Sequence, residues 1–171
     1  MMETETFERF PLRIVLLSVG VALAIYALGA SLLGQLHGLL AAAYLLYACG
    51  VEVSVMRGSC IHCYYYGKRC GLGKGWLCAR LFRQGDPARF AQRTASWRDL
   101  LPDMLILLFP LAGGVVLLLQ AFSWLWVVLL LALVALSLGG NAVVRGSFAC
   151  KYCKQRELGC PAQALFAGKE T

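Results

Sequence analysis

The sequence predicts an all-α integral membrane protein in which four transmembrane helices form two tandem, duplicated helical hairpins with cysteine-rich cytosolic loops. Three observations support this fold class: long apolar runs, basic residues confined to one side of those runs, and a cysteine pattern that occurs twice. Of the 171 residues, 60% are hydrophobic and only 15% are charged, whereas a soluble domain has roughly 25% charged residues. The apolar excess is gathered into runs, as expected when lipid is the solvent.

Four apolar runs are long enough to cross a bilayer, and they cover residues 14–33, 36–56, 104–119 and 121–138. A hydrocarbon core of about 30 Å requires about 20 helical residues. The first and fourth runs meet this length directly, and the second and third meet it if their ends reach the headgroups. Each run must be helical, because lipid offers no hydrogen-bond partners to open backbone groups.

The basic residues indicate the orientation. Short turns are expected at about Gly34-Gln35 and at residues 120–123, and all 16 Lys and Arg residues lie outside these turns. Short loops rich in Lys and Arg stay in the cytoplasm. The sequence therefore predicts a multi-pass protein of the cell (inner) membrane, with both termini and the cysteine loops cytosolic. The net charge of +7 fits attraction to lipid headgroups, and no nucleic-acid partner is expected because no recognition motif accompanies it.

Two segments share one cysteine spacing, C-x2-C-x6-C. The first cysteine loop, residues 60–70, reads CIHCYYYGKRC, and the second cysteine loop, residues 150–160, reads CKYCKQRELGC. An Arg-Gly-Ser precedes each of them. We interpret this as a duplication of one hairpin unit. Two copies that each cross the membrane twice have the same orientation and are related by a pseudo-two-fold axis along the membrane normal, which would bring both loops to one cytosolic face.

The predicted division of the chain has three parts: a first hairpin unit with its cysteine loop (1–75), an amphipathic interfacial linker (76–101), and a second hairpin unit with its cysteine loop and a short tail (102–171). The linker mixes aromatic and basic residues, which is typical of helices lying in the membrane interface. Asp86-Pro87 has the residue types of a helix start.

The cysteines are the candidate site. Cytosolic thiols are kept reduced, so clustered cysteines there indicate metal binding or catalysis. Structural zinc takes four ligands, and the first site is expected to use Cys60, Cys63, Cys70 and Cys78. His62 is a less favoured ligand, because the repeat has Tyr152 at that position. The second site is expected to use Cys150, Cys153 and Cys160, with a fourth ligand supplied by water, by substrate or by a residue of the first unit.

The favoured function is a pair of metal-thiolate sites that serve docking of a cytosolic or membrane protein partner, or electron transfer, at the lipid bilayer. Zinc is slightly favoured over an iron–sulfur cluster for the first site, because four thiolates in a short polar loop suit a closed structural site. A membrane thiol-disulfide or sulfur-transfer enzyme and a soft-metal transporter are the alternatives. The sequence leaves open whether the chain is an enzyme and whether it forms a homo-oligomer.

Three further expectations concern residues outside the cysteine pattern. Glu52, near the cytosolic end of the second span, is a functional candidate, and the alternative is an interfacial carboxylate that pairs with Arg57 or another basic side chain. The three tyrosines 64–66 are expected to anchor at the headgroups. Cys49, within the second span, is expected to pack in the core.

Overall fold

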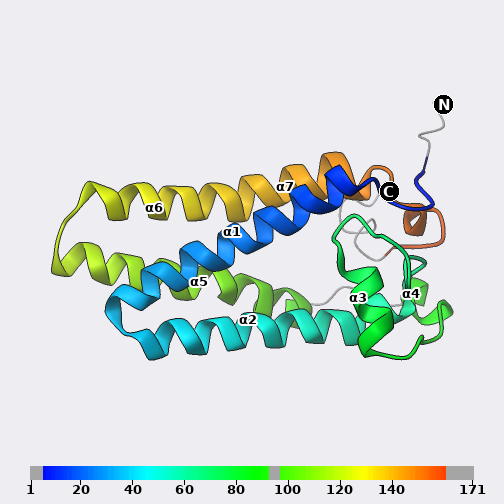
Figure 1. Ribbon diagram of the computed structural model, residues 1–171, viewed down its shortest axis with the longest axis horizontal. Helices are drawn as coiled ribbons and strands as arrows, with labels where there is room; N and C mark the ends of the chain where they lie inside the picture. Colours follow the sequence, from blue (N-terminus) through cyan, green and yellow to red (C-terminus); the bar gives the residue numbers. More distant parts are fainter. Residues whose placement is uncertain (1–5, 93–96, 161–171) are drawn as a thin grey trace. The chain divides into compact units, whose positions relative to one another are not determined.

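The computed structural model describes residues 6–92 and 97–160. Within these residues the chain is all-helical (Figure 1) and contains no β-strand. An isolated β-bridge joins Phe7 and Cys153. Four helical segments are long and apolar enough to cross a membrane. The prediction of an all-helical protein with four such helices is therefore confirmed.

The long helices are α1 (Leu12–Leu36), α2 (Gly38–Gly58), α5 (Trp97–Gln120) and a helix from Trp124 to Cys150. The last of these begins as α6 (Trp124–Val134) and continues through π-helical turns (Ala135–Gly140), the short α7 (Asn141–Val143) and further π-helical turns (Val144–Cys150). The shorter elements are 3₁₀ turns at Cys60–His62 and Lys154–Arg156, α3 (Lys74–Leu81) and α4 (Ala88–Gln92).

Several boundaries differ from the prediction. The first turn lies at His37 and not at Gly34-Gln35, because α1 remains helical to Leu36. The third span starts before residue 104, since α5 begins at Trp97 and includes Pro102. The fourth span continues beyond residue 138 as far as Cys150. Its Arg-Gly-Ser therefore lies inside a helix, whereas α2 ends at the Gly of the first Arg-Gly-Ser.

The chain folds as two compact units, which we call the cysteine unit and the helical unit. The cysteine unit comprises Met1–Val19, Val53–Ser96 and Val143–Thr171, and the helical unit comprises Gly20–Glu52 and Trp97–Ala142. The cysteine unit contains all the predicted ligand cysteines. Both units are assembled from distant segments, so each is defined by tertiary contacts and not by a continuous stretch of sequence.

In the helical unit, a tyrosine hydroxyl replaces a backbone hydrogen-bond donor that a proline removes. Pro110 lies inside α5 and cannot donate the hydrogen bond that the carbonyl of Ile106 would normally accept. The Tyr44 hydroxyl donates to this Ile106 oxygen at 3.1 Å. Tyr44 fits there because α1 has Gly29 opposite the ring, where a Cβ would approach the Tyr44 Oη to 2.5 Å. A carbonyl that would cost several kcal/mol if left unpaired in lipid is thereby satisfied.

The helices of the helical unit approach one another at glycines. A Cβ on Gly113 would lie 2.7 Å from a methyl of Leu33 in α1, and a Cβ on Gly114 would lie 2.4 Å from a methyl of Leu130 in α6. Small residues at such contacts are typical of helices that pack in lipid, where close van der Waals contact replaces the hydrophobic driving force.

One expectation about the second span needs correction, because Cys49 is exposed and does not pack in the core. The reason is the rotation of α2 about its axis, which the uniformly apolar sequence does not specify. In the same helix, the Glu52 carboxylate accepts a hydrogen bond from the Tyr26 hydroxyl of α1.

Candidate metal centre

The cysteine loops have the same local backbone structure at their C-x2-C turns. In the first loop, the N–H of Cys63 donates to the Cys60 carbonyl at 3.3 Å. In the second, the N–H of Cys153 donates to the Cys150 carbonyl, also at 3.3 Å. The next turn is also the same in both loops. The N–H of Tyr66 donates to the Cys63 carbonyl and the N–H of Arg156 donates to the Cys153 carbonyl, each at 3.0 Å.

The sulfur atoms of these turns accept backbone hydrogen bonds at equivalent positions. The N–H of Tyr65 is bonded to Cys63, and the N–H of Gln155 is bonded to Cys153. In each loop the donor is therefore the second residue after the cysteine. Hydrogen bonds from backbone N–H groups stabilise the thiolate, which is the form that binds a metal.

Cys70 accepts two further backbone hydrogen bonds at the start of α3. The N–H groups of Lys74 and Gly75 both lie 3.2 Å from its sulfur. These are the first two residues of α3, so the sulfur satisfies N–H groups that have no partner within the helix. This arrangement requires the turn at Gly73, whose φ of +77° is in the region that favours glycine.

Cys78 lies on the buried face of α3. Its side chain is 0% exposed, and its sulfur lies 3.7 Å from the carbonyl oxygen of Met56. The same helix face contains Gly75, where a Cβ would approach the carbonyl oxygen of Tyr65 to 2.2 Å. Glycine at this position therefore lets α3 pack directly against the first cysteine loop.

The cysteine loops are joined by a reciprocal pair of hydrogen bonds. The N–H of Tyr64 donates to the Gln155 side-chain oxygen at 2.7 Å, and the N–H of Lys154 donates to the Tyr65 hydroxyl at 3.0 Å. Tyr64 and Lys154 each directly follow the second cysteine of their own loop. Tyr65 and Gln155 are the next residues, and they are only 2% and 5% exposed. Each loop thus uses the same two positions to contact the other.

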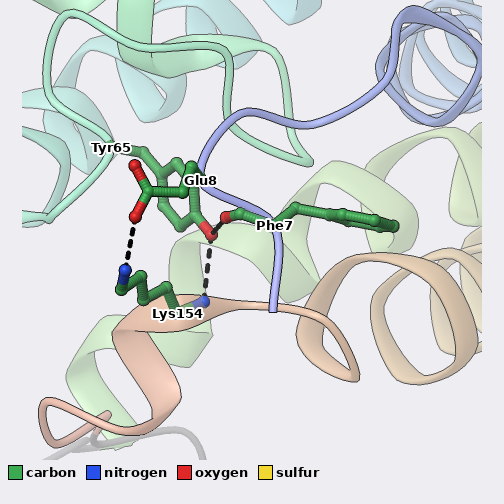
Figure 2. A network of polar contacts seen from close by, with 4 residues as sticks. All are labelled: Phe7, Glu8, Tyr65 and Lys154. Atoms are coloured by element: carbon green, nitrogen blue, oxygen red, sulfur yellow. Dashed lines mark hydrogen bonds and ion pairs between the residues drawn. The ribbon is translucent and has the colours of Figure 1, made fainter. Parts of the chain in front are cut away.

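The N-terminal segment completes this junction. The Tyr65 hydroxyl donates to the carbonyl oxygen of Phe7 while accepting from the Lys154 N–H, and the Lys154 ammonium pairs with Glu8 (Figure 2). The N–H of Phe7 also donates to the Tyr152 carbonyl at 3.0 Å. The first loop, the second loop and the N-terminal segment therefore meet at one tyrosine side chain.

The four cysteines expected in the first site lie near one another. Electrostatic interactions connect every pair among Cys60, Cys63, Cys70 and Cys78. Burial raises the pKa of the Cys63 thiol to about 11, and the neighbouring thiolates add to this effect. Burial likewise raises the pKa of Cys78, and Cys70 contributes in the same direction. Deprotonating such a group of thiols without a cation would place like charges together at low dielectric.

The three cysteines expected in the second site are connected in the same way, because Cys150, Cys153 and Cys160 all interact electrostatically. Burial raises the pKa of Cys153 to about 12, against the hydrogen bond from Gln155. The thiolate that adds most to this shift is Cys63 of the other loop.

Basic side chains near the cysteines have different roles. Arg145 and Arg156 favour a thiolate at Cys150. Lys68, in contrast, lies 3.9 Å from the ring centre of Tyr64, where a cation is attracted by the face of the ring. Lys154 pairs with the exposed carboxylate of Glu8.

In the part of the chain that the structure describes, no three His, Cys, Asp or Glu side chains are arranged so that they could hold a metal ion as they stand. The thiols are gathered but not drawn in to ligand distance. His62 is engaged elsewhere, since its Nδ1 lies 2.8 Å from the carbonyl oxygen of Asp86.

Sequence reasoning missed the residues that join the loops, above all Tyr65 and Gln155. The tyrosines of the first loop do not share a headgroup position: Tyr65 is buried, and the Tyr66 hydroxyl donates to the Phe82 carbonyl at 2.7 Å. One available signal was the alignment of the two loops, which places Tyr65 and Gln155 at the same position. The role of Phe7 had no signal in the pattern.

The fold and the site define an all-helical protein with four helices able to span a membrane and a folded unit in which distant cysteine loops meet. Comparisons with protein-family models, with curated proteins and with solved structures find no match to this chain.

Proposed function

We propose that this chain is a multi-pass membrane protein whose cysteine unit binds a soft metal through thiolates on the cytosolic side of the bilayer. The ligands of the first site are Cys60, Cys63, Cys70 and Cys78, and those of the second are Cys150, Cys153 and Cys160. Zinc is the favoured metal, and an iron–sulfur cluster is the second choice. The metal sites order a surface for docking of a protein partner, or pass electrons to it.

This proposal rests on the backbone hydrogen bonds that the cysteine sulfurs accept at equivalent positions of both loops. Cys63 and Cys153 each accept a backbone hydrogen bond from the residue two positions later, and Cys70 accepts two more. Hydrogen bonds to ligand atoms orient a metal site and tune its charge. A buried cysteine that only filled space would require no such donors.

The raised pKa values of the thiols oppose thiol exchange when no metal is bound. With the pKa of Cys63 at about 11 and that of Cys153 at about 12, both are protonated near neutral pH when no metal is present. Exchange requires the thiolate as the attacking species. A bound cation would displace these protons and remove the repulsion between neighbouring thiolates.

The transporter alternative has less support. Its path should place polar or thiol ligands between the spanning helices. In the helical unit, Tyr26 donates to Glu52, Tyr44 donates to a carbonyl of α5, and Tyr47 donates to the Pro102 carbonyl at 3.1 Å. These bonds connect helix to helix, and Cys49 lies exposed on α2.

The duplication and the orientation belong to the same proposal. The matching backbone hydrogen bonds of the two C-x2-C turns, and the reciprocal contacts between the loops, support descent of both halves from one hairpin unit. The distribution of Lys and Arg supports cytosolic loops. The exposed Trp76, Leu77 and Leu81 of α3, with Arg80 lying over the Trp76 ring, support contact with the membrane interface.

The decisive experiment is metal analysis with a visible absorption spectrum on protein purified anaerobically in detergent. Colourless protein containing zinc supports a structural or docking role, and brown protein containing iron and labile sulfide supports electron transfer. Metal-free protein that remains unable to bind added zinc or iron would refute the proposal. A variant with Cys49→Ser is the matched control, because it removes a thiol outside the cysteine unit and should leave the metal content unchanged.

A further inference from the structure

Cys63 interacts with both groups of sulfurs. Within the first loop it interacts electrostatically with Cys60, Cys70 and Cys78. Across the loop junction it also interacts with Cys153 and Cys160.

A closed circuit of hydrogen bonds fixes Cys63 beside the second loop. The N–H of Tyr64 donates to the side chain of Gln155, whose own N–H is bonded to the sulfur of Cys153. In return, the N–H of Lys154 donates to the side chain of Tyr65, whose own N–H is bonded to the sulfur of Cys63. The two sulfurs are therefore held by the same circuit.

The circuit is supported by packing on either side. The isolated β-bridge between Phe7 and Cys153 places the N-terminal segment against the second loop, and the Phe10 N–H donates to the Arg69 carbonyl of the first loop at 3.0 Å. Gly71, which follows the first loop, is close enough to Ala149 that a Cβ would lie 2.9 Å from the alanine methyl. The loop junction is thus a packed contact and not a single hydrogen bond.

We propose that Cys63 is a bridging thiolate, shared between a metal ion in the first loop and a second metal ion in the second loop. This inference rests on the proposed metal-binding function. One ion is held by Cys60, Cys63, Cys70 and Cys78. The other ion is held by Cys63, Cys150, Cys153 and Cys160.

The ligand count supports this arrangement. Zinc and related soft ions prefer four sulfur ligands in a tetrahedron. The second loop has only three cysteines, and the first loop together with α3 has four. If Cys63 serves both ions, each obtains four thiolates, and every cysteine except Cys49 is used. A thiolate sulfur has enough lone pairs to bind a second cation.

The surrounding charges fit such a cluster. More thiolates would be present than two divalent cations neutralise, so the cluster would be anionic. Lys74 interacts with Cys60, and Arg145 and Arg156 interact with Cys150. Cations near these ligands offset the remaining charge.

Cadmium-113 NMR tests the bridge directly on the full chain in detergent, after removal of bound metal and loading with cadmium ions. The expected result is two bound ions per chain and two resonances that are scalar-coupled to each other through the shared sulfur. This measurement needs no variant, so it does not depend on the folding of a mutant. Two uncoupled resonances, or a single bound ion, would overturn the bridge while leaving the proposed function intact. No bound cadmium at all would refute both.

A pair of variants tests the same point by affinity. Cys60→Ser should weaken only the first site and leave one cadmium ion tightly bound by the second loop. Adding Cys63→Ser to that background should then lower the affinity for this remaining ion by about 100-fold or more, since it would lose a direct ligand. If the affinity of the second-loop ion is unchanged by Cys63→Ser, the sites are separate and the bridge is wrong. Circular dichroism of both variants checks that the helices are retained.

Discussion

At the scale of single residues, the cysteine unit depends on side chains that are not cysteines. The hydroxyl of Tyr65 serves two backbone groups at once, donating to the carbonyl of Phe7 and accepting from the N–H of Lys154 (Figure 2). Its ring packs 5.3 Å from that of Phe10, and both residues are almost completely buried. A buried backbone group that loses its partner costs more than the hydrogen bond itself contributes.

Tyr65→Phe should therefore loosen the junction between the cysteine loops. The expected cost is about 1–3 kcal/mol, because the Phe7 carbonyl and the Lys154 N–H both lose their partner. Faster reaction of the metal-free cysteines with a maleimide in detergent would report the loosening. Tyr47→Phe is the matched control, because it removes a hydroxyl that bonds a backbone carbonyl in the helical unit. Equal thiol reactivity in both variants would contradict the prediction.

Gly75→Ala should destabilise the cysteine unit by a steric route. The new Cβ would lie 2.2 Å from the carbonyl oxygen of Tyr65 and 2.5 Å from that of Lys68. Backbone atoms cannot rotate away, so α3 must shift, at a cost typical of overpacking, about 1–3 kcal/mol. A lower metal affinity is expected, measured by competition with a chelator. Gly146→Ala, with nothing within 4 Å of the added Cβ, should bind metal as the wild type does.

At the scale of elements, α5 illustrates how a membrane helix tolerates proline. Pro102 and Pro110 both lie inside it. The carbonyl of Ile106, left without its usual donor by Pro110, accepts from Tyr44 of α2, and Gly29 of α1 makes room for the tyrosine ring. One irregularity in α5 is thus compensated by residues on two other helices, as the absence of water in lipid requires.

Gly29→Ala should break this arrangement. Its Cβ would come within 2.5 Å of the Tyr44 hydroxyl oxygen, so the ring must move and its bond to the Ile106 carbonyl is lost. We expect the free energy of unfolding to fall by about 1–3 kcal/mol. The measurement is the thermal unfolding temperature in detergent, monitored by tryptophan fluorescence, which should be lower than that of the wild type. Gly20→Ala in the same helix is the control, since nothing lies within 4 Å of its added Cβ. A Gly29→Ala protein as stable as the control would show that Tyr44 is not constrained.

At the scale of the whole molecule, the proposed chemistry depends on the compartment in which the cysteines lie. Thiols in the reducing cytosol are available to a metal, whereas thiols on the outer side would be oxidised to disulfides. The orientation is proposed from the distribution of basic residues, and it is testable independently of any metal.

Intact cells treated with a membrane-impermeant maleimide should leave Cys60 and Cys150 unlabelled, and permeabilised cells treated with a chelator should label both. His37→Cys, in the exposed turn between α1 and α2, is the positive control and should be labelled from outside. The native cysteines are best retained singly, in a background where the others are serine. Labelling of Cys150 in intact cells would place the loops on the outer face and remove the basis for a metal site there.

The sequence by itself determined the class of this protein. Long apolar runs require helices in lipid, and the repeated C-x2-C-x6-C spacing identified the cysteine loops as the place to look for chemistry. Local signals of this kind survive without tertiary information because hydrophobicity and cysteine spacing are read along the chain. The predicted ends of the first and fourth spans, at residues 33 and 138, differ from the observed helix ends at Leu36 and Cys150. An apolar sequence does not specify where a helix ends.

Only the tertiary structure decided which residues meet. The contact of Tyr65 with Lys154 and of Tyr64 with Gln155 joins segments that are about ninety positions apart, and no periodicity encodes it. The rotation of α2, which directs Glu52 to Tyr26, depends on packing against α1, since the apolar residues on all sides of the helix leave its facing undetermined. The contacts between the cysteine loops place Cys63 beside the second loop, because the position of a side chain relative to a distant segment is fixed by the contacts of the folded chain.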